Sequence, residues 1–229
     1  MTKASTTQKK NSLPSTSKEY YPVFLDVSGK RCVIIGGGRV AERKCGPLIR
    51  GGAEVTVISP EITPRLVMFN KKGMLRHVRR SYRKGDIRSA FMVIVATDSD
   101  ATNKRVAADA AEGNVLVNVV DKPALCNFIV PSVLRQAPLA IAVSTGGVSP
   151  ALARTIRREI EGRYLTRFAQ YLRFLKGIRM KAMKGIPGKR KREKFLKGLA
   201  SEGLVGILTG KGIKAVKKEV RCRMKKLSI

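Results

Sequence analysis

The chain has 229 residues, of which 43% are hydrophobic and 5% aromatic, so it can form one substantial domain with a smaller one. The scarcity of aromatic side chains, with no Trp, disfavours a stacking platform for single-stranded nucleic acid. Lys and Arg outnumber Asp and Glu by 47 to 16, a formal net charge of +31. Such an excess implies nucleic acid, an anionic membrane surface or a substrate with many carboxylates as partner, or else a generally basic protein with a solvated tail.

Cysteine and histidine usage disfavours a zinc site. The four cysteines contain no C-x-x-C pair, and His77 is the single histidine. We therefore expect a reduced, cytoplasmic protein with inert thiols and no metal ligands. No apolar stretch resembles a signal peptide or a transmembrane helix. Residues 1–19 are rich in Ser, Thr and Lys, which favours a disordered tail over an organelle transit peptide.

The first predicted elements form a strand–helix–strand unit. After an extended segment at residues 20–25, the continuous apolar run at 31–35 predicts a buried parallel strand. A helix is predicted over 39–50, with Gly51 and Gly52 ending it, and a second strand over 54–60. This is the βαβ context that a dinucleotide-binding loop requires.

The turn between the first strand and the helix carries the fingerprint Gly36-x-Gly38-x-x-Ala41. Gly36 permits the tight turn, and Gly38 allows the backbone to approach a pyrophosphate. Ala41 lets the helix pack closely on the sheet. The pyrophosphate would lie at the helix N-terminus, beside Arg39 and Val40, where free N–H groups favour an anion.

The end of the second strand is where an acidic residue often binds the ribose hydroxyls. Here the sequence is Ser59-Pro60-Glu61, so either Glu61 or Ser59 is expected to contact the ribose. No Arg follows directly to hold a 2′-phosphate, although Arg65 is near. This pattern favours NAD over NADP.

The next elements complete an α/β fold with a Rossmann-type parallel sheet. Further strands are predicted at 75–78, 91–97 and 115–121, with helices at 64–72 and 101–112 and a loop at 81–86. In such sheets ligands bind at the carboxyl ends of the strands. Polar residues occupy three of these ends besides the glycine loop: Ser59 to Glu61, Thr97 with Asp98, and Asp121.

The pattern changes after the fifth strand. Strand-like runs at 127–134 and 139–144 precede a turn at 145–150 and a helix at 151–164. Residues 165–200 are predicted to be helical with a break around 185–188, and 214–226 to form a basic helix. The run Lys189–Arg192 is interpreted as a flexible, solvated segment or, alternatively, a nucleic-acid or membrane contact.

Five motifs in this order resemble the siroheme synthase family, in its precorrin-2 dehydrogenase and sirohydrochlorin ferrochelatase module, over about residues 20–165. They are GGGRVAERK from Gly36, ATD from Ala96, NVVDKP from Asn118, FIVPS from Phe128 and VSTGGVSPALA from Val143. Residues 166–229 match that family only by position and helical character.

The resemblance implies NAD-dependent oxidation of precorrin-2 to sirohydrochlorin. It implies that Asp121 is the catalytic general base, and that Asn118, Ser144, Thr145 and Gly146 contact the substrate. The implied domains are a tail at 1–19, an NAD-binding domain at 20–125, a dimerisation and active-cleft segment at 126–165, and a basic helical domain at 166–229. Members are homodimers, and their eight-carboxylate substrate gives the basic side chains near the cleft a use: Arg135, Arg154, Arg157 and Arg158.

Two alternatives stay open from the sequence. A bifunctional enzyme would also insert Fe²⁺ into sirohydrochlorin, with a carboxylate such as Asp121 taking the ring proton. A module of another class would sense a dinucleotide or bind nucleic acid on the same fold, since a fold does not determine function. Such a module would need neither Asp121 nor the loop from Ser144 to Gly147.

Overall fold

A computed structural model describes residues 18–227, except for the side chains of residues 163 and 164. Contacts within the chain divide it into two compact units, with the boundary between Val130 and Pro131. Most of the predicted disordered tail at residues 1–19 lies outside the described residues.

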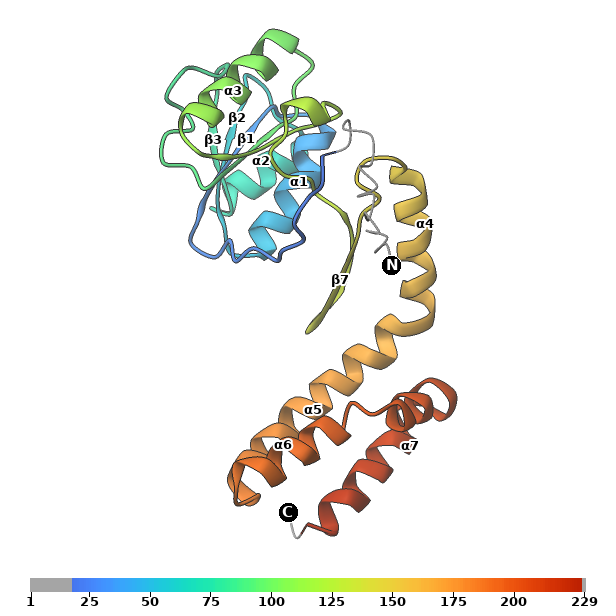
Figure 1. Ribbon diagram of the computed structural model, residues 1–229. Coiled ribbons are helices and arrows are strands. Elements are labelled where there is room, and N and C mark those ends of the chain that lie inside the picture. The colour runs from blue at the N-terminus through green and yellow to red at the C-terminus, as the bar shows by residue number, and fades with distance from the viewer. Residues whose placement is uncertain (1–17, 228–229) are drawn as a thin grey trace, which may run out of the picture. The chain divides into compact units, whose positions relative to one another are not determined.

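The first unit is built on a sheet of five parallel strands in the order β3-β2-β1-β4-β5 (Figure 1). The strands are β1 (Arg31–Ile35), β2 (Glu54–Ile58), β3 (Arg76–Val78), β4 (Met92–Val95) and β5 (Leu116–Val119). The helices are α1 (Arg39–Arg50), α2 (Pro64–Lys71) and α3 (Asp100–Glu112), with a short 3₁₀ turn at Pro123–Leu125. The predicted α/β fold with a parallel Rossmann-type sheet is confirmed.

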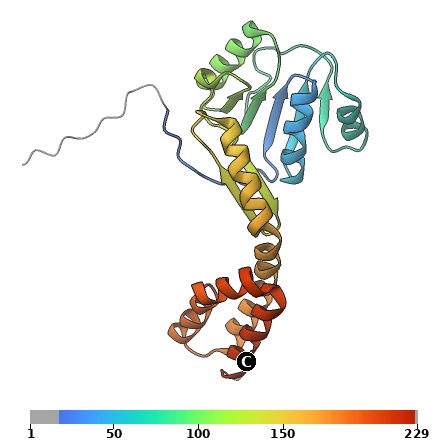
Figure 2. The same cartoon turned by 90° about the vertical axis from the view of Figure 1, so that its right-hand side faces the viewer.

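Both faces of the sheet are covered, which explains why β1 is apolar without alternation (Figure 2). Cys32 and Ile34 pack with α1 and α2 on one face. Val33 and Ile35 pack on the other face with α3 and with the connection from β3 to β4. That connection, residues 79–91, contains no helix, and it supplies the buried side chains Tyr82, Ile87 and Ala90.

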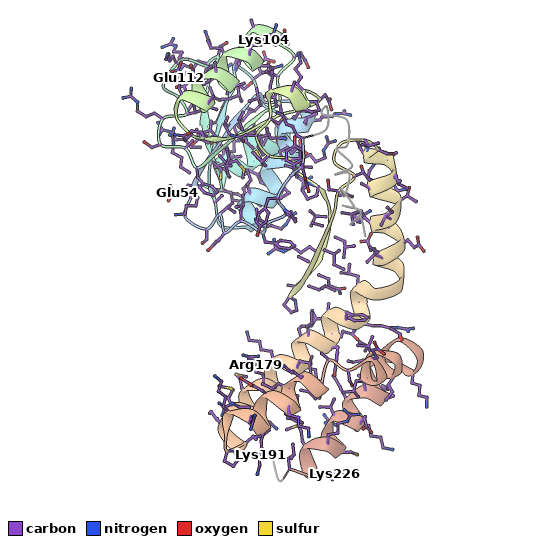
Figure 3. All side chains as sticks on the ribbon, viewed as in Figure 1. Glu54, Lys104, Glu112, Arg179, Lys191 and Lys226 are labelled. Atoms are coloured by element: carbon purple, nitrogen blue, oxygen red, sulfur yellow. The ribbon has the colours of Figure 1, made fainter. Side chains whose placement is uncertain are left out.

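The second unit begins with an antiparallel hairpin of β6 (Ser132–Gln136) and β7 (Leu139–Val143). Ser149 then caps α4 (Pro150–Ile160), which continues through a π-helical turn at Glu161–Leu165. The helices α5 (Thr166–Gly185), α6 (Lys189–Gly198) and α7 (Glu202–Lys225) enclose a separate apolar core that includes Leu204, Leu208 and Val216. Arg179 projects from α5 and Lys191 from α6, and Lys226 directly follows α7 (Figure 3).

Most element boundaries agree with the sequence predictions, including β1, α1 and the break between α5 and α6. Three predictions were wrong. Residues 127–131 form no strand, because the side chain of Asn127 bonds to the backbone of Val115 and Val117 and holds this segment against the end of β5. Lys189–Arg192 is the first turn of α6 rather than a flexible run. The last helix starts at Glu202, because its glycines are compatible with a helix up to a kink at Gly212, where φ is +81°.

In the part of the chain that the structure describes, no helix combines the length and the hydropathy that crossing a bilayer requires.

Candidate dinucleotide site at the carboxyl edge of the sheet

The strand order of the first unit reverses direction between β1 and β4. From β1 the chain moves outward through β2 to β3, and then returns to place β4 on the other side of β1. Connections leaving β1 and β4 therefore diverge at their carboxyl ends, which is where open α/β sheets bind ligands. Gly36 follows β1 and Ala96 follows β4, so the predicted glycine loop lies at this point.

The three glycines of the loop have different surroundings. Gly36 has φ of +112°, and a Cβ there would overlap the backbone carbonyl of Ala96. A Cβ on Gly37 would overlap the carbonyl of Glu61 and come within 2.8 Å of Ser59 Oγ. A Cβ on Gly38 would meet nothing within 4 Å. Gly36 and Gly37 are thus required by packing, whereas Gly38 leaves open space beside the helix that follows. The pattern Gly36-x-Gly38-x-x-Ala41 assigns no role to Gly37.

The N-terminus of α1 is suited to an anion. Its N-cap residue, Gly38, supplies no side-chain hydrogen bond to the first turn. Arg39 is exposed and Val40 half-buried in that turn. The nearby acid, Glu42, accepts a hydrogen bond from Thr63 Oγ1 at 2.8 Å and pairs with Arg65 at 3.6 Å, so its charge is already partnered. Uncapped N–H groups and open space over Gly38 fit the pyrophosphate of a dinucleotide.

The end of β2 forms the neighbouring wall of the site. Ser59 is buried against Gly37, and its carbonyl accepts a hydrogen bond from His77 Nε2 at 2.9 Å. The single histidine therefore contacts the backbone at the end of β2. Pro60 and Glu61 are exposed beside the loop. Arg65 contacts Glu42 and lies over the ring of Phe69 at 5.6 Å, so the nearest arginine along the chain already has two partners.

The end of β4 is held by a residue that the sequence analysis missed. The buried side chain of Asn103 donates from Nδ2 to the carbonyl of Thr97 at 3.2 Å, and Thr97 Oγ1 accepts from the N–H of Ser99. Asn103 Oδ1 is buried and has no hydrogen-bond partner among the described residues. Asp98 is exposed at the same edge. The sequence did contain a signal for the role of Asn103, because it is a polar residue on the otherwise apolar face of α3 that also carries Val106 and Ala110.

Asp121 ends the fifth strand region in an unusual backbone conformation. Its φ is +59°, a region that Asp tolerates better than most residues, and its side chain is exposed. Lys44 of α1 interacts with it electrostatically. Burial, with the charge of Arg43, lowers the pKa of Lys44, and the carboxylate of Asp121 opposes that lowering. A half-buried ammonium therefore accompanies the carboxylate at the edge of the sheet.

The segment after Asp121 is fixed to β5 by buried polar contacts. Asn118 Nδ2 donates to the carbonyl of Phe128 at 3.1 Å, and Cys126 Sγ accepts from the N–H of Val119 at 3.1 Å. The side chain of Asn118 thus holds this segment against β5. Its contact with substrate stays a prediction.

The remaining predicted substrate residues belong to the second unit. Ser144 Oγ accepts from the N–H of Gly146 at 3.1 Å, and Thr145 Oγ1 accepts from the N–H of Ser149 at 3.1 Å. Both hydroxyls shape the turn before α4, in which Gly146 has φ of +63°. Ser144 and Gly146 are exposed and Thr145 is half-buried.

The thiols of the first unit are structural. Cys32, Cys45 and Cys126 are buried, and burial together with Glu42 raises the pKa of Cys45 to about 12. Within residues 18–227, no three His, Cys, Asp or Glu side chains gather closely enough to hold a metal ion.

Comparisons with known proteins agree with this architecture. Residues 23–132 match a family model described as putative NAD(P)-binding, and residues 136–163 match one described as sirohaem biosynthesis protein central. The chain is 37% identical over 177 residues to a siroheme synthase of Thioalkalivibrio sulfidiphilus, which is 77% of this chain and 36% of that protein. It is 43% identical over 143 residues to one of Methylobacillus flagellatus, which is 62% of this chain and 31% of the relative.

The chain therefore spans 31–40% of the length of these curated relatives. A solved structure of a precorrin-2 dehydrogenase, SirC, superposes with a TM-score of 0.75 at 25% identity, over 88% of this chain and 99% of that one. The NAD(P)-binding model spans the glycine loop described above, and it supports a nicotinamide dinucleotide, NAD or NADP, as the cofactor. By its NAD(P)-binding and central regions, the chain belongs to the siroheme synthase family.

Proposed function

We propose that the protein is an NAD-dependent dehydrogenase that oxidises precorrin-2 to sirohydrochlorin in sirohaem biosynthesis. One observation carries the proposal. The glycine loop after β1 and the carboxylate of Asp121 after β5 lie at the same edge of the parallel sheet, where the strands have their carboxyl ends. The likeness to a precorrin-2 dehydrogenase over nearly its whole length supports the choice of substrate.

NAD is the proposed cofactor, and when bound it accepts the hydride that leaves the substrate. Gly36 and Gly38 shape the approach to its pyrophosphate, with the N–H groups of Arg39 and Val40 facing the anion. Ser59, Pro60 and Glu61 line the ribose side, and Thr97 with Asp98 the opposite side. NAD is favoured over NADP because Arg65, the arginine nearest along the chain to the end of β2, already contacts Glu42 and Phe69.

Asp121 is proposed to take the proton that the substrate loses together with the hydride. Loss of one hydride and one proton removes two electrons from the tetrapyrrole and leaves a new double bond, so the electrons balance. The exposed carboxylate can reach a bound molecule, and the segment 118–128 that carries it is braced by Asn118, Cys126 and Asn127. Lys44 lies close enough to interact electrostatically with that carboxylate.

The substrate would be held through its carboxylates. Asn118, Ser144, Thr145 and Gly146 are the proposed contacts, with Arg135, Arg154 and Arg158 as exposed cations of the second unit. Arg157 pairs with Glu161 at 2.5 Å, so it is less available. A cytoplasmic homodimer that uses the segment 126–165 for assembly completes the proposal.

The decisive experiment follows sirohydrochlorin formation by absorbance, with precorrin-2 and NAD. We expect wild-type turnover, and we expect Asp121→Ala and Asp121→Asn to bind NAD normally in calorimetry while turnover falls about 10²–10⁴-fold. Asp26→Asn is the matched control, because Asp26 precedes β1 at the opposite edge of the sheet and its variant should keep full activity. An Asp121→Asn enzyme as fast as the control would remove Asp121 from the mechanism. A wild-type protein that binds NAD without converting precorrin-2 would overturn the proposed reaction.

A further inference from the structure

A cavity of about 240 Å³ lies on the face of the sheet that faces α3, over β1 to β3. It exists because the connection of residues 79–91 crosses this face as a loop instead of a helix, which leaves the sheet incompletely filled. Its floor is the row of side chains from β2 and β3 that alternation directs to this face, among them Thr56 and Arg76, which are register partners.

The walls of the cavity are strongly cationic. Three guanidinium groups line it, from Arg31 at the start of β1, Arg76 at the start of β3 and Arg80 in the loop. The one carboxylate in the lining, Asp86, binds Arg80 through both oxygens at 2.7 Å, so its charge is neutralised by that pair. The charges of Arg31 and Arg76 are left without an acid in the lining.

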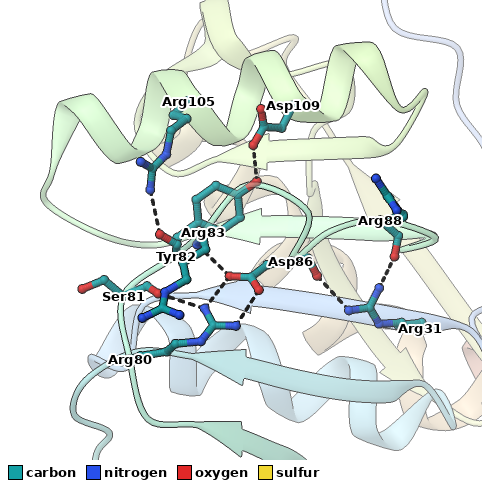
Figure 4. A network of polar contacts seen from close by, with 9 residues as sticks. All are labelled: Arg31, Arg80, Ser81, Tyr82, Arg83, Asp86, Arg88, Arg105 and Asp109. Carbon is teal, nitrogen blue, oxygen red and sulfur yellow. Dashed lines mark hydrogen bonds and ion pairs between the residues drawn. The ribbon is translucent and has the colours of Figure 1, made fainter.

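Two of the three arginines, Arg31 and Arg80, are preorganised by hydrogen bonds that leave some of their donors free (Figure 4). Arg31 donates to the carbonyls of Arg88 and Asp86, and Arg80 to Asp86 and the carbonyl of Ser81. A guanidinium has five N–H donors, so both retain unused ones. The side chain of Arg76, in contrast to its backbone in β3, makes no hydrogen bond or ion pair in the described part of the chain.

The loop that carries Arg80 is itself held firmly. Tyr82 is buried, its hydroxyl donates to Asp109 of α3 at 2.6 Å, and its carbonyl accepts from Arg105 at 2.7 Å (Figure 4). The carboxylate of Asp86 also accepts from the N–H of Arg83 at 2.7 Å. The cationic wall therefore does not need to be ordered by a ligand, which lowers the cost of binding.

We propose that this cavity is a binding site for a phosphate-type oxyanion, separate from the dinucleotide edge. Guanidinium groups bind tetrahedral oxyanions through paired N–H donors, and the hydroxyl of Thr56 adds a further donor on the floor. The volume suits a phosphoryl group with a few waters, because drug-sized ligands occupy roughly 300–1,000 Å³. The free anion and the phosphoryl group of a small metabolite share this chemistry.

The test uses amide NMR spectra of the full chain titrated with inorganic phosphate in one arm and glycerol phosphate in the other. We expect saturable shifts at Gly85, Asp86 and Arg88. Arg76→Gln should raise the apparent dissociation constant at least tenfold without changing the melting temperature, because the Arg76 side chain makes no hydrogen bond or ion pair within the described residues. Saturable binding of either probe supports the site. The probe that binds more tightly shows whether the natural ligand is the free anion or the phosphoryl group of a metabolite.

Arg79→Gln is the matched control, since it removes the same charge three residues away from an exposed side chain outside the cavity lining. It should change the constant by less than twofold. Equal weakening by both substitutions would show diffuse attraction to a basic protein and overturn the proposal. Shifts confined to Gly36–Gly38, or shifts that never saturate, would overturn it as well.

Discussion

Substituting alanine for single glycines of the loop separates packing from cofactor binding. Gly36→Ala places a Cβ into the carbonyl of Ala96, 2.7 Å from its carbonyl carbon, at a φ of +112°. The neighbour is backbone and cannot rotate away. Strain at such a φ costs about 1–3 kcal/mol and overpacking a similar amount, so we expect a loss of about 2–6 kcal/mol in the free energy of unfolding.

Gly38→Ala should behave differently. The residue has φ of −79° and ψ of −172°, which alanine adopts readily, and its Cβ would meet nothing within 4 Å. The gain of about 0.4–1 kcal/mol from a stiffer unfolded chain roughly offsets the few tenths lost at an N-cap. The free energy of unfolding should therefore stay within about 1 kcal/mol of the wild type, whereas the methyl group fills the space proposed for the pyrophosphate.

Loss of a hydrogen bond to a charged group costs about 1.5–3 kcal/mol, so NAD should bind Gly38→Ala roughly 10–150-fold more weakly. Urea unfolding followed by circular dichroism and calorimetric titration with NAD measure the two quantities. Gly203→Ala is the control, because its Cβ would also meet open space, in α7. Normal NAD affinity in the Gly38→Ala protein would refute the placement of the pyrophosphate, and an undiminished stability of Gly36→Ala would refute the packing analysis.

Two further predictions concern the polar contacts of the first unit. The pKa of Asp86 is lowered by its hydrogen bonds with Arg80, so the folded state binds that proton more weakly than the unfolded state, and the stabilisation is present above about pH 4 and lost as pH falls through the folded-state pKa. Asp86→Asn should therefore cost about 1–2 kcal/mol at pH 7, at the lower end because Arg80 is partly exposed. In urea titrations, the difference in stability between the two proteins should shrink as pH falls through the folded-state pKa of Asp86, and a constant difference would contradict the linkage. Asn118→Ala should cost about 1 kcal/mol and speed amide hydrogen exchange at residues 126–128, and unchanged exchange there would show that Asn118 does not brace the segment.

The sequence by itself determined those helices and strands whose boundaries depend on residues close together in the chain. The β-branched run of β1 and the Gly51-Gly52 stop after α1 predicted those boundaries, because continuous burial and helix termination depend on neighbouring residues. The position of the glycine fingerprint between a strand and a helix also predicted the cofactor edge. The polar residues at the ends of β2, β4 and β5 were predicted to share one edge because parallel strands must align.

Tertiary structure decided what depends on residues distant in sequence. Gly37 needs to be glycine because the chain after β2 returns against it. The segment 127–131 has the composition of a strand, yet the side chain of Asn127 satisfies the edge of β5 in its place. The arginine-lined cavity combines residues 31, 76 and 80. They come together only through the register of the strands and the non-helical connection from β3 to β4. Sequence periodicity specifies which face a side chain takes, whereas the neighbour on that face is set by how the whole sheet is assembled.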